Sequence, residues 1–246
     1  MSARQRVDQQ PGFVLHSYPY RETSLIVEVF SRDHGRVGLV AKGARRPMSQ
    51  LRGVLMAFQP LFIDWSGGGE MKTLVRAEWQ GGQPLLGGQA LLCAYYLNEL
   101  LMRLLPREDA HPALYRAYGE ALRALADDES RELVLRRFEL AMLQELGYGL
   151  ELESDCDGRP VRPDSRYAYI IERGAVPLDE YGVEDDGSVV SGQTLLDMAR
   201  GEFRNPESLA GSKALMRRLI QHYLGGQVLQ SRRVFTELLA YPGESS

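Results

Sequence analysis

The sequence has few of the residues that form disulfide frameworks and metal sites. It contains 2 cysteines and 4 histidines among its 246 residues. Cys93 and Cys156 lie far apart along the chain, and no two histidines have the spacing of a metal-ligand pair. These absences exclude a disulfide-rich extracellular domain. We also expect the protein to need no metal ion and no other cofactor.

Long apolar runs are absent as well. The chain has no stretch of about 18 or more apolar residues, so we expect no membrane-spanning helix and no membrane partner. The first residues, Met1–Asp8, lack the apolar centre of a signal peptide. We therefore expect a cytoplasmic protein.

The motifs of the common catalytic sites are missing too. No Gly-x-Ser-x-Gly elbow and no His-Glu-x-x-His zinc motif occurs. The run Gly67–Thr73 resembles a phosphate-binding loop, but Met71 stands where that loop needs a glycine before the lysine. The acidic cluster Glu184–Asp186 is better interpreted as a solvated turn than as a cation site. We therefore expect a protein that is not an enzyme.

Charge is distributed unevenly along the chain. The formal net charge is −4. Residues 1–80 nevertheless carry 11 Lys and Arg against 7 Asp and Glu, whereas the remaining residues carry 18 against 26. A chain divided in this way can bind a polyanion with its first part while the rest stays acidic.

Residues 35–53 combine a strand pattern with a cationic loop. Val37, Leu39 and Ala41 alternate with other residues and predict a strand, which Gly43 ends. The loop and its entrance carry four cations, Lys42, Arg45, Arg46 and Arg52. Such a cluster suits the backbone of a polyanion better than a small substrate, although a solvated basic loop is the alternative.

The first 80 residues predict a small barrel. Residues 1–10 are polar, and we expect them to be mobile. Turn residues separate five predicted strands at residues 13–16, 23–30, 37–41, 61–65 and 72–79. Five closely spaced strands favour a closed barrel of either the OB or the SH3-like type.

Helices replace strands after the glycines at positions 81, 82, 87 and 88, so we predict two domains, residues 1–82 and 83–246. The predicted helices cover residues 90–105, 112–126, 130–146, 193–200, 206–224 and 231–239. Between them, residues 150–190 predict a small irregular insert with one strand at 167–171. The fold class expected is α+β with several domains.

Several segments, in this order along the chain, resemble the bacterial RecO family of recombination mediators. They are Phe13–Leu25, Gly35–Arg45, Leu97–Leu101, Leu135–Leu140 with Leu146–Tyr148, and Tyr223–Gly226 with Leu229–Arg232. Residues 150–190 match least. The resemblance implies an N-terminal OB barrel and a C-terminal helical domain. Many members carry a four-cysteine zinc module, but this segment has only Cys156 and implies a form without zinc.

The resemblance also implies a non-catalytic role in DNA repair and recombination. Such a protein binds single- and double-stranded DNA in the nucleoid and anneals complementary strands. With RecR it helps to load RecA onto DNA coated by single-strand binding protein (SSB), whose C-terminal tail it recognises. Two rivals stay open: a barrel adaptor with incidental DNA binding, and a nuclease that uses the acidic C-terminal half.

Candidate DNA contacts follow from the barrel prediction. Six cations are proposed to contact phosphates: Arg36, Lys42, Arg45, Arg46, Arg52 and Lys72. Four aromatic residues are candidates for stacking on bases: Phe13, Tyr20, Phe58 and Trp65. For Phe13 and Trp65, a position inside the barrel is the favoured interpretation.

Arg136, Arg137 and Phe138 are the candidates for binding the SSB tail. In one interpretation, an arginine at the rim of an apolar pocket binds the terminal carboxylate and the pocket takes the terminal phenylalanine. In the other, Arg136 forms intrahelical ion pairs with Glu132 or Glu139. On a later helix, Lys213, Arg217 and Arg218 add steering charge or extend the DNA track.

Overall fold

The computed structural model describes residues 6–181, 189–203 and 205–240. Packing divides the chain into two units: unit 1 comprises residues 1–128 and 229–246, and unit 2 comprises residues 129–228. Strands give way to helices near the predicted boundary at residues 82 and 83. Three helices that follow this boundary nevertheless belong to unit 1.

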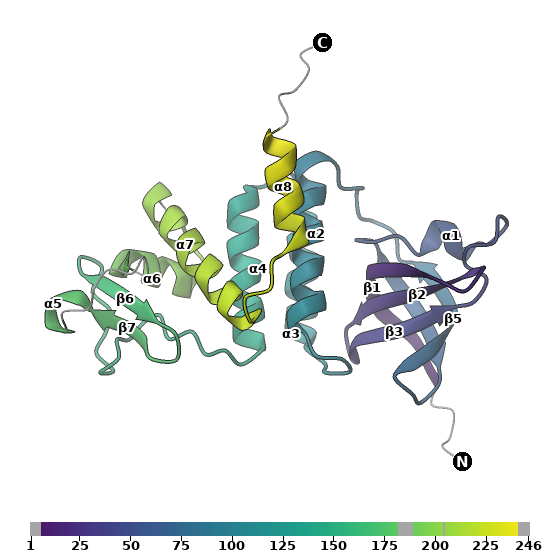
Figure 1. Ribbon diagram of the computed structural model, residues 1–246, viewed down its shortest axis with the longest axis horizontal. Helices are drawn as coiled ribbons and strands as arrows, with labels where there is room; N and C mark the ends of the chain where they lie inside the picture. Colours follow the sequence, from purple (N-terminus) through teal and green to yellow (C-terminus); the bar gives the residue numbers. More distant parts are fainter. Residues whose placement is uncertain (1–5, 182–188, 204, 241–246) are drawn as a thin grey trace, which may run out of the picture. The chain divides into compact units, whose positions relative to one another are not determined.

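Unit 1 contains a closed five-stranded barrel (Figure 1). Its strands are β1 (Arg6–Tyr20), β2 (Ser24–Ser31), β3 (Gly35–Ala41), β4 (Pro60–Ser66) and β5 (Met71–Trp79), with the short helix α1 (Leu51–Val54) between β3 and β4. The strand order is β1-β2-β3-β5-β4, and only β3 and β5 among the pairs are parallel. This order identifies an OB barrel rather than an SH3-like one.

The barrel interior is formed by every second side chain of each strand, as the two-residue period requires. Its largest member is Trp65, which is 1% exposed, so the predicted position inside the barrel is confirmed. The remaining buried strand residues are Val14, Val27, Val29, Val37, Leu39, Ala41, Leu61, Ile63 and Leu74. Burial of this much branched apolar surface is the main stabilising contribution to the barrel.

The prediction that residues 1–10 are mobile is wrong for residues 6–10, which form the first part of β1. Arg6 pairs with Ser66 of β4, and the backbone N–H of Gln9 donates to Asp64 Oδ1 over 2.7 Å. A polar segment is ordered here because closing the barrel requires β1 to pair with both β2 and β4. The side-chain pattern did not show this, since most of the segment faces solvent.

Besides α1, unit 1 contains the helices α2 (Gly88–Leu104), α3 (Pro112–Ala126) and α8 (Gln230–Ala240). A buried polar chain joins α3 and α2 to the barrel: Tyr118 Oη donates to Asn98 Oδ1 over 2.5 Å, and Asn98 Nδ2 donates to the carbonyl of Leu15 over 2.8 Å. The carboxylate of Glu99 accepts hydrogen bonds from the first residues of α8. Unit 1 is therefore a barrel with its own helical support.

Unit 2 is helical with a small sheet (Figure 1). Its helices are α4 (Arg131–Glu145), α5 (Leu178–Tyr181), α6 (Gly192–Arg200) and α7 (Pro206–Tyr223), and its strands are β6 (Arg166–Ile170), β7 (Gly174–Pro177) and β8 (Val189–Ser191). The strands form an antiparallel sheet in the order β7-β6-β8. Residues 150–190 contain the predicted small insert, and the strand predicted at 167–171 is found as β6; the strands β7 and β8 were not predicted. The acidic cluster Glu184–Asp186 lies outside the described residues.

Cys156 lies in a tight turn of unit 2 that is held by hydrogen bonds. Asp155 Oδ1 accepts the backbone N–H groups of Asp157 and Arg159, each over 2.9 Å. In the part of the chain that the structure describes, no group of three or more His, Cys, Asp or Glu is arranged to hold a metal ion. Within the same residues, no helix combines the length and the apolar character that crossing a membrane requires.

Candidate nucleic-acid interface

Two loops meet at one end of the barrel. They are the turn between β1 and β2 and the loop that follows β3. The backbone N–H of Arg45 donates to the carbonyl of Thr23 over 2.9 Å, and the N–H of Gly43 donates to Ser24 Oγ over 3.4 Å. Arg45 Nη1 also donates to the carbonyl of Arg21 over 3.4 Å. These bonds hold cations from two separate segments beside each other.

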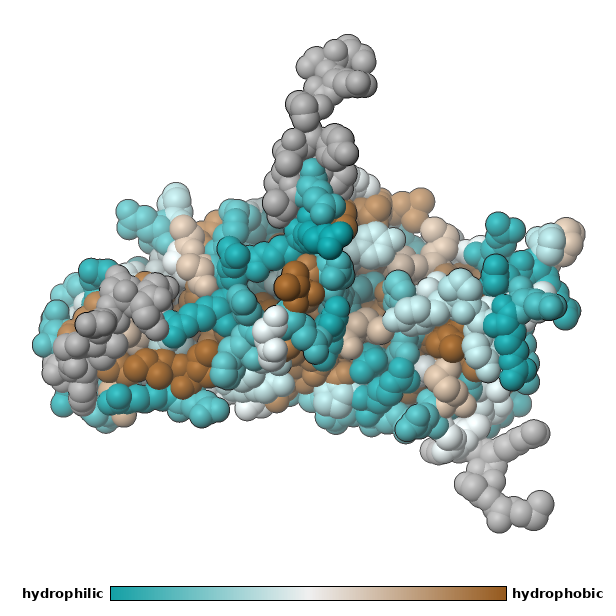
Figure 2. Space-filling model, in the orientation of Figure 1, coloured by the Kyte–Doolittle hydropathy of each residue, from teal (hydrophilic) through white to brown (hydrophobic). Residues whose placement is uncertain are grey.

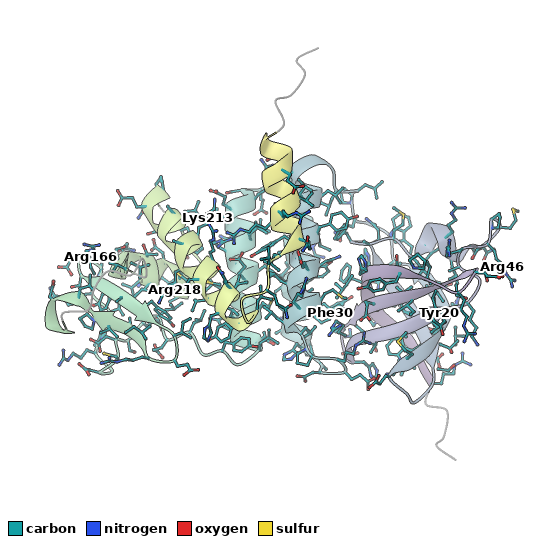
Figure 3. All side chains as sticks on the ribbon, viewed as in Figure 1. Tyr20, Phe30, Arg46, Arg166, Lys213 and Arg218 are labelled. Carbon is teal, nitrogen blue, oxygen red and sulfur yellow. The ribbon has the colours of Figure 1, made fainter. Side chains whose placement is uncertain are left out.

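We call this region the cationic end, and define it by Arg21, Lys42, Arg45, Arg46 and Arg52. All five side chains are exposed, and within the described ranges none of them forms a salt bridge. Figure 3 shows Arg46 and Tyr20 toward the side of the barrel opposite Phe30, which lies toward α3. In Figure 2, hydrophilic residues cover much of this part of the barrel surface. Four of these cations belong to the predicted basic segment, Lys42, Arg45 and Arg46 in the loop after β3 and Arg52 in α1.

Arg21 is the member that the sequence prediction missed. Its φ is 52°, in the left-handed region that non-glycine residues rarely adopt. Its guanidinium carbon lies 5.2 Å from the centre of the Tyr20 ring, within the range of a cation–π contact. The sequence did contain a signal for Arg21: this residue lies between the strands predicted at 13–16 and 23–30, and therefore in a turn.

Two of the six predicted phosphate contacts, Arg36 and Lys72, have charges that are already engaged inside unit 1. Arg36 Nη1 lies 3.3 Å from Glu28 Oε2, and its Nε donates to the carbonyl of Leu105 over 3.0 Å. Lys72 forms an ion pair with Glu108, and its side chain is 10% exposed. Arg36 and Lys72 are therefore structural residues, and we remove them from the candidate DNA contacts.

The outer face of β1, β2 and β3 consists of four rows of side chains across the strands. Strand pairing defines the rows as Phe13–Phe30–Arg36, His16–Glu28–Gly38, Tyr18–Ile26–Val40 and Tyr20–Ser24. Lys42 continues the fourth row because it follows Ala41, whose side chain is in the core. The last two rows lead directly to the cationic end.

The helical part of unit 1 covers the first row. Phe13 lies 5.3 Å from Tyr115 and 5.1 Å from Tyr118, between ring centres, and Phe30 lies 5.5 Å from Tyr115. Burial raises the pKa of the Tyr118 hydroxyl well above its ordinary value. The ring contacts with Tyr115 and Tyr118 correct the prediction that Phe13 lies inside the barrel: its side chain is buried between the outer face and α3.

In the second row, Glu28 is paired with Arg107 as well as Arg36 and is 3% exposed. The third and fourth rows reach solvent in part: Tyr18 is 43% exposed, whereas Tyr20, Ser24, Ile26 and Val40 are partly buried. Of the predicted stacking residues, Trp65 and Phe58 are also buried, at 1% and 5% exposed, and only Tyr20 reaches the surface. The open half of the outer face is thus bordered by two tyrosines of β1.

The predicted tail site on α4 is closed. Arg136 Nη2 lies 2.7 Å from Glu139 Oε1, and these side chains are 8% and 0% exposed. Phe138 is 2% exposed, and the exposed Arg137 donates to the carbonyl of Gly201 over 3.0 Å. The intrahelical ion pair is therefore the arrangement found, and the side chains of Arg136 and Phe138 are buried rather than open to a ligand.

A shallow basic pocket of about 400 Å³ lies instead on α7. It is lined by Ile171, Ala214, Arg217, Arg218, Gln221 and His222. Nearby, the rings of Tyr148 and Tyr223 stack with centres 3.9 Å apart. Lys213, on the same helix (Figure 3), is outside the lining and pairs with Glu132 over 3.1 Å.

Comparison with known proteins agrees with this architecture. The model of the N-terminal region of recombination protein O matches residues 5–82, and the model of its C-terminal region matches residues 87–233. DNA repair protein RecO of Aromatoleum aromaticum is 66% identical over 97% of this chain and 99% of its own length. The RecO protein of an Azoarcus species is 67% identical over the same shares, and that of Dechloromonas aromatica is 58% identical, again over 97% and 99%. The chain therefore belongs to the RecO family of non-catalytic DNA repair proteins.

Proposed function

We propose that this protein is a recombination mediator that binds single- and double-stranded DNA through the cationic end of its barrel. The observation that supports this most directly is the set of five exposed cations on the β1–β2 turn and on the segment between β3 and β4, which hydrogen bonds join. In the described residues none of them is neutralised by a salt bridge. Because these groups are exposed and form no salt bridge in that part of the chain, their charge is available to phosphates.

Phosphate binding at such a surface is independent of base sequence. Each phosphate contact releases condensed counterions, so log K falls by about 0.7 to 0.9 for each log unit of salt and each contact. A protein that handles any single strand exposed during repair needs this kind of recognition. Because the rest of the chain carries more acidic than basic residues, it repels DNA, and DNA binding is confined to the barrel.

Annealing follows from the same chemistry. Two single strands repel each other, and a cationic surface that holds one strand lowers the cost of bringing the second close. Base pairing then supplies the free energy, so no nucleotide cofactor is required. We propose that the protein anneals complementary strands in this way and, with RecR, helps to load RecA onto SSB-coated DNA.

We further propose that the SSB tail binds in the α7 pocket rather than on α4. Ile171 and Ala214 supply apolar lining for a terminal phenylalanine, and Arg217 at the same pocket supplies a guanidinium for the terminal carboxylate. Titration with a tail peptide should give weaker binding to Arg217→Ala than to the wild type. Lys213→Ala is the matched control, because Lys213 is on α7 but outside the pocket lining. Equal affinities for all three proteins would contradict this position.

Strand annealing tests the main proposal. Complementary oligonucleotides are mixed with the protein, once bare and once coated with SSB, and duplex formation is followed by fluorescence. We expect faster annealing in both cases, and a smaller effect for Arg45→Ala combined with Arg46→Ala. If the wild type does not accelerate annealing and does not bind labelled DNA at low salt, the alternative of a protein-interaction adaptor is favoured.

A further inference from the structure

The open part of the outer barrel face has the composition of a stacking platform. Tyr18 and Tyr20 border it on β1, and Ile26 and Val40 are its partly buried centre. Side chains two residues apart on a strand lie on one face about 6.6 Å apart. Two aromatic rings are therefore presented side by side next to an apolar strip.

Neighbouring groups contact both rings. His16 meets Tyr18 edge to face with ring centres 4.4 Å apart, and the Arg21 guanidinium lies over Tyr20 at 5.2 Å. Lys42 and Arg45 adjoin the same rows at the cationic end. Rings that are held by neighbours while still reaching solvent lose less conformational entropy when they bind a ligand.

We propose that Tyr18 and Tyr20 stack on unpaired bases whose phosphates are held at the cationic end. The barrel face therefore selects single strands over duplex DNA. This inference rests on the proposed DNA binding and adds the class of DNA that the site prefers. Every base has a flat surface that can stack on an aromatic ring, so the stacking is independent of the DNA sequence.

The preference follows from which groups each form of DNA exposes. Phosphates are available in both forms, so the cationic end contributes to the binding of both. In a duplex the base faces are already stacked on one another, whereas a single strand offers them to Tyr18 and Tyr20. Removal of the two rings should therefore weaken single-strand binding and leave duplex binding almost unchanged.

The test uses two ligands with the same phosphates: a labelled oligothymidylate and a strand of equal length in which abasic sites replace the bases. We expect the wild-type protein to bind oligothymidylate more tightly than the abasic strand. Tyr18→Ala combined with Tyr20→Ala should weaken binding of oligothymidylate by at least about tenfold. The same variant should bind the abasic strand and a duplex within about twofold of the wild type, with an unchanged salt slope.

Two control variants and two further measurements keep the result interpretable. Trp79→Ala removes an aromatic residue that is 59% exposed on β5, and it should bind like the wild type. The variant with Tyr18→Phe and Tyr20→Phe keeps the rings and should keep the preference for bases. Circular dichroism melting shows whether each variant is folded, and photocrosslinking of wild type to a bromodeoxyuridine strand should label Tyr18 or Tyr20.

Equal binding of oligothymidylate and the abasic strand by the wild type would overturn the inference. So would equal decreases in affinity for single strands and duplexes, or crosslinks confined to other residues. In each of these cases the proposal that the protein binds DNA in a salt-dependent manner would remain valid. If the wild type bound none of the three DNA ligands, the proposed function would fail instead.

Discussion

The backbone N–H of Arg45 donates a hydrogen bond of 2.9 Å to the carbonyl of Thr23. This bond joins the loop after β3 to the turn between β1 and β2, two segments that are separated in sequence by β2 and β3. Its consequence is that Arg21, at the tip of the turn, lies beside the loop cations. The cationic end is therefore a product of the fold and not of one basic stretch.

Arg21→Ala should weaken DNA binding although Arg21 is outside the basic stretch. If Arg21 binds one phosphate, we expect the slope of log K against log salt to fall by about 0.7 for single strands. Fluorescence anisotropy at several salt concentrations measures this slope. Arg76→Ala is the matched control, because Arg76 is an exposed arginine of β5 that already pairs with Glu78. An equal change of slope in both variants would contradict a specific role for Arg21.

Arg36→Ala should affect stability rather than DNA binding. Removing the side chain takes one partner from the buried Glu28 carboxylate and the donor from the Leu105 carbonyl. We expect the free energy of unfolding to fall by about 1–3 kcal/mol, measured by urea denaturation. Arg45→Ala, at an exposed position, should change it by no more than about 0.5 kcal/mol. A stable Arg36→Ala protein with a reduced salt slope would restore Arg36 as a phosphate contact.

Arg136→Ala should destabilise the protein strongly. It leaves the fully buried Glu139 carboxylate without the guanidinium 2.7 Å away, and removal of one member of a buried pair typically costs about 3–5 kcal/mol. Arg137→Ala should cost less than about 1 kcal/mol, because Arg137 is exposed. Denaturant unfolding of both variants gives the comparison. A native-like Arg136→Ala protein that no longer binds the tail peptide would contradict the structural role.

Glu99 should make the attachment of α8 sensitive to acid. Burial alone raises the pKa of this carboxyl, but hydrogen bonds from Ser231 and Gln230 outweigh burial and lower the pKa below 4.5. Because the pKa is lower in the folded than in the unfolded chain, the stabilisation is complete above pH 4.5. It then disappears as the pH falls through the folded value.

Thermal unfolding of the wild type and of Glu99→Gln at a series of pH values checks this expectation. The wild type should be the more stable protein at neutral pH, and the difference should shrink below pH 4.5. A difference that stays constant through the acid range would show that the charge of Glu99 does not stabilise the fold.

Local sequence patterns predicted most elements of this fold. The helix at residues 112–126 coincides with α3, where Pro112 suits a first turn. What the patterns did not show was pairing between distant segments. The OB order depends on the parallel pairing of β3 with β5, and residues 6–10 are ordered only because they pair with β4.

In the candidate site, too, local patterns predicted the features that are close in sequence and missed the contacts between distant residues. Lys42, Arg45, Arg46 and Arg52 are close in sequence, so their cluster was predictable. Lys72 is neutralised by Glu108, a partner 36 residues away that no local pattern indicates. Tyr18 was missed although its signal was present, since His16, Tyr18 and Tyr20 alternate along one strand face.

The salt dependence of single-strand binding by the wild type and by Arg45→Ala combined with Arg46→Ala tests the central claim most directly. If the cationic end holds the DNA backbone, the double variant should bind more weakly. Its slope of log K against log salt should also be shallower, by about 0.7 for each phosphate that the two arginines no longer bind. A double variant that binds single strands with the slope and affinity of the wild type would place the DNA elsewhere on the protein.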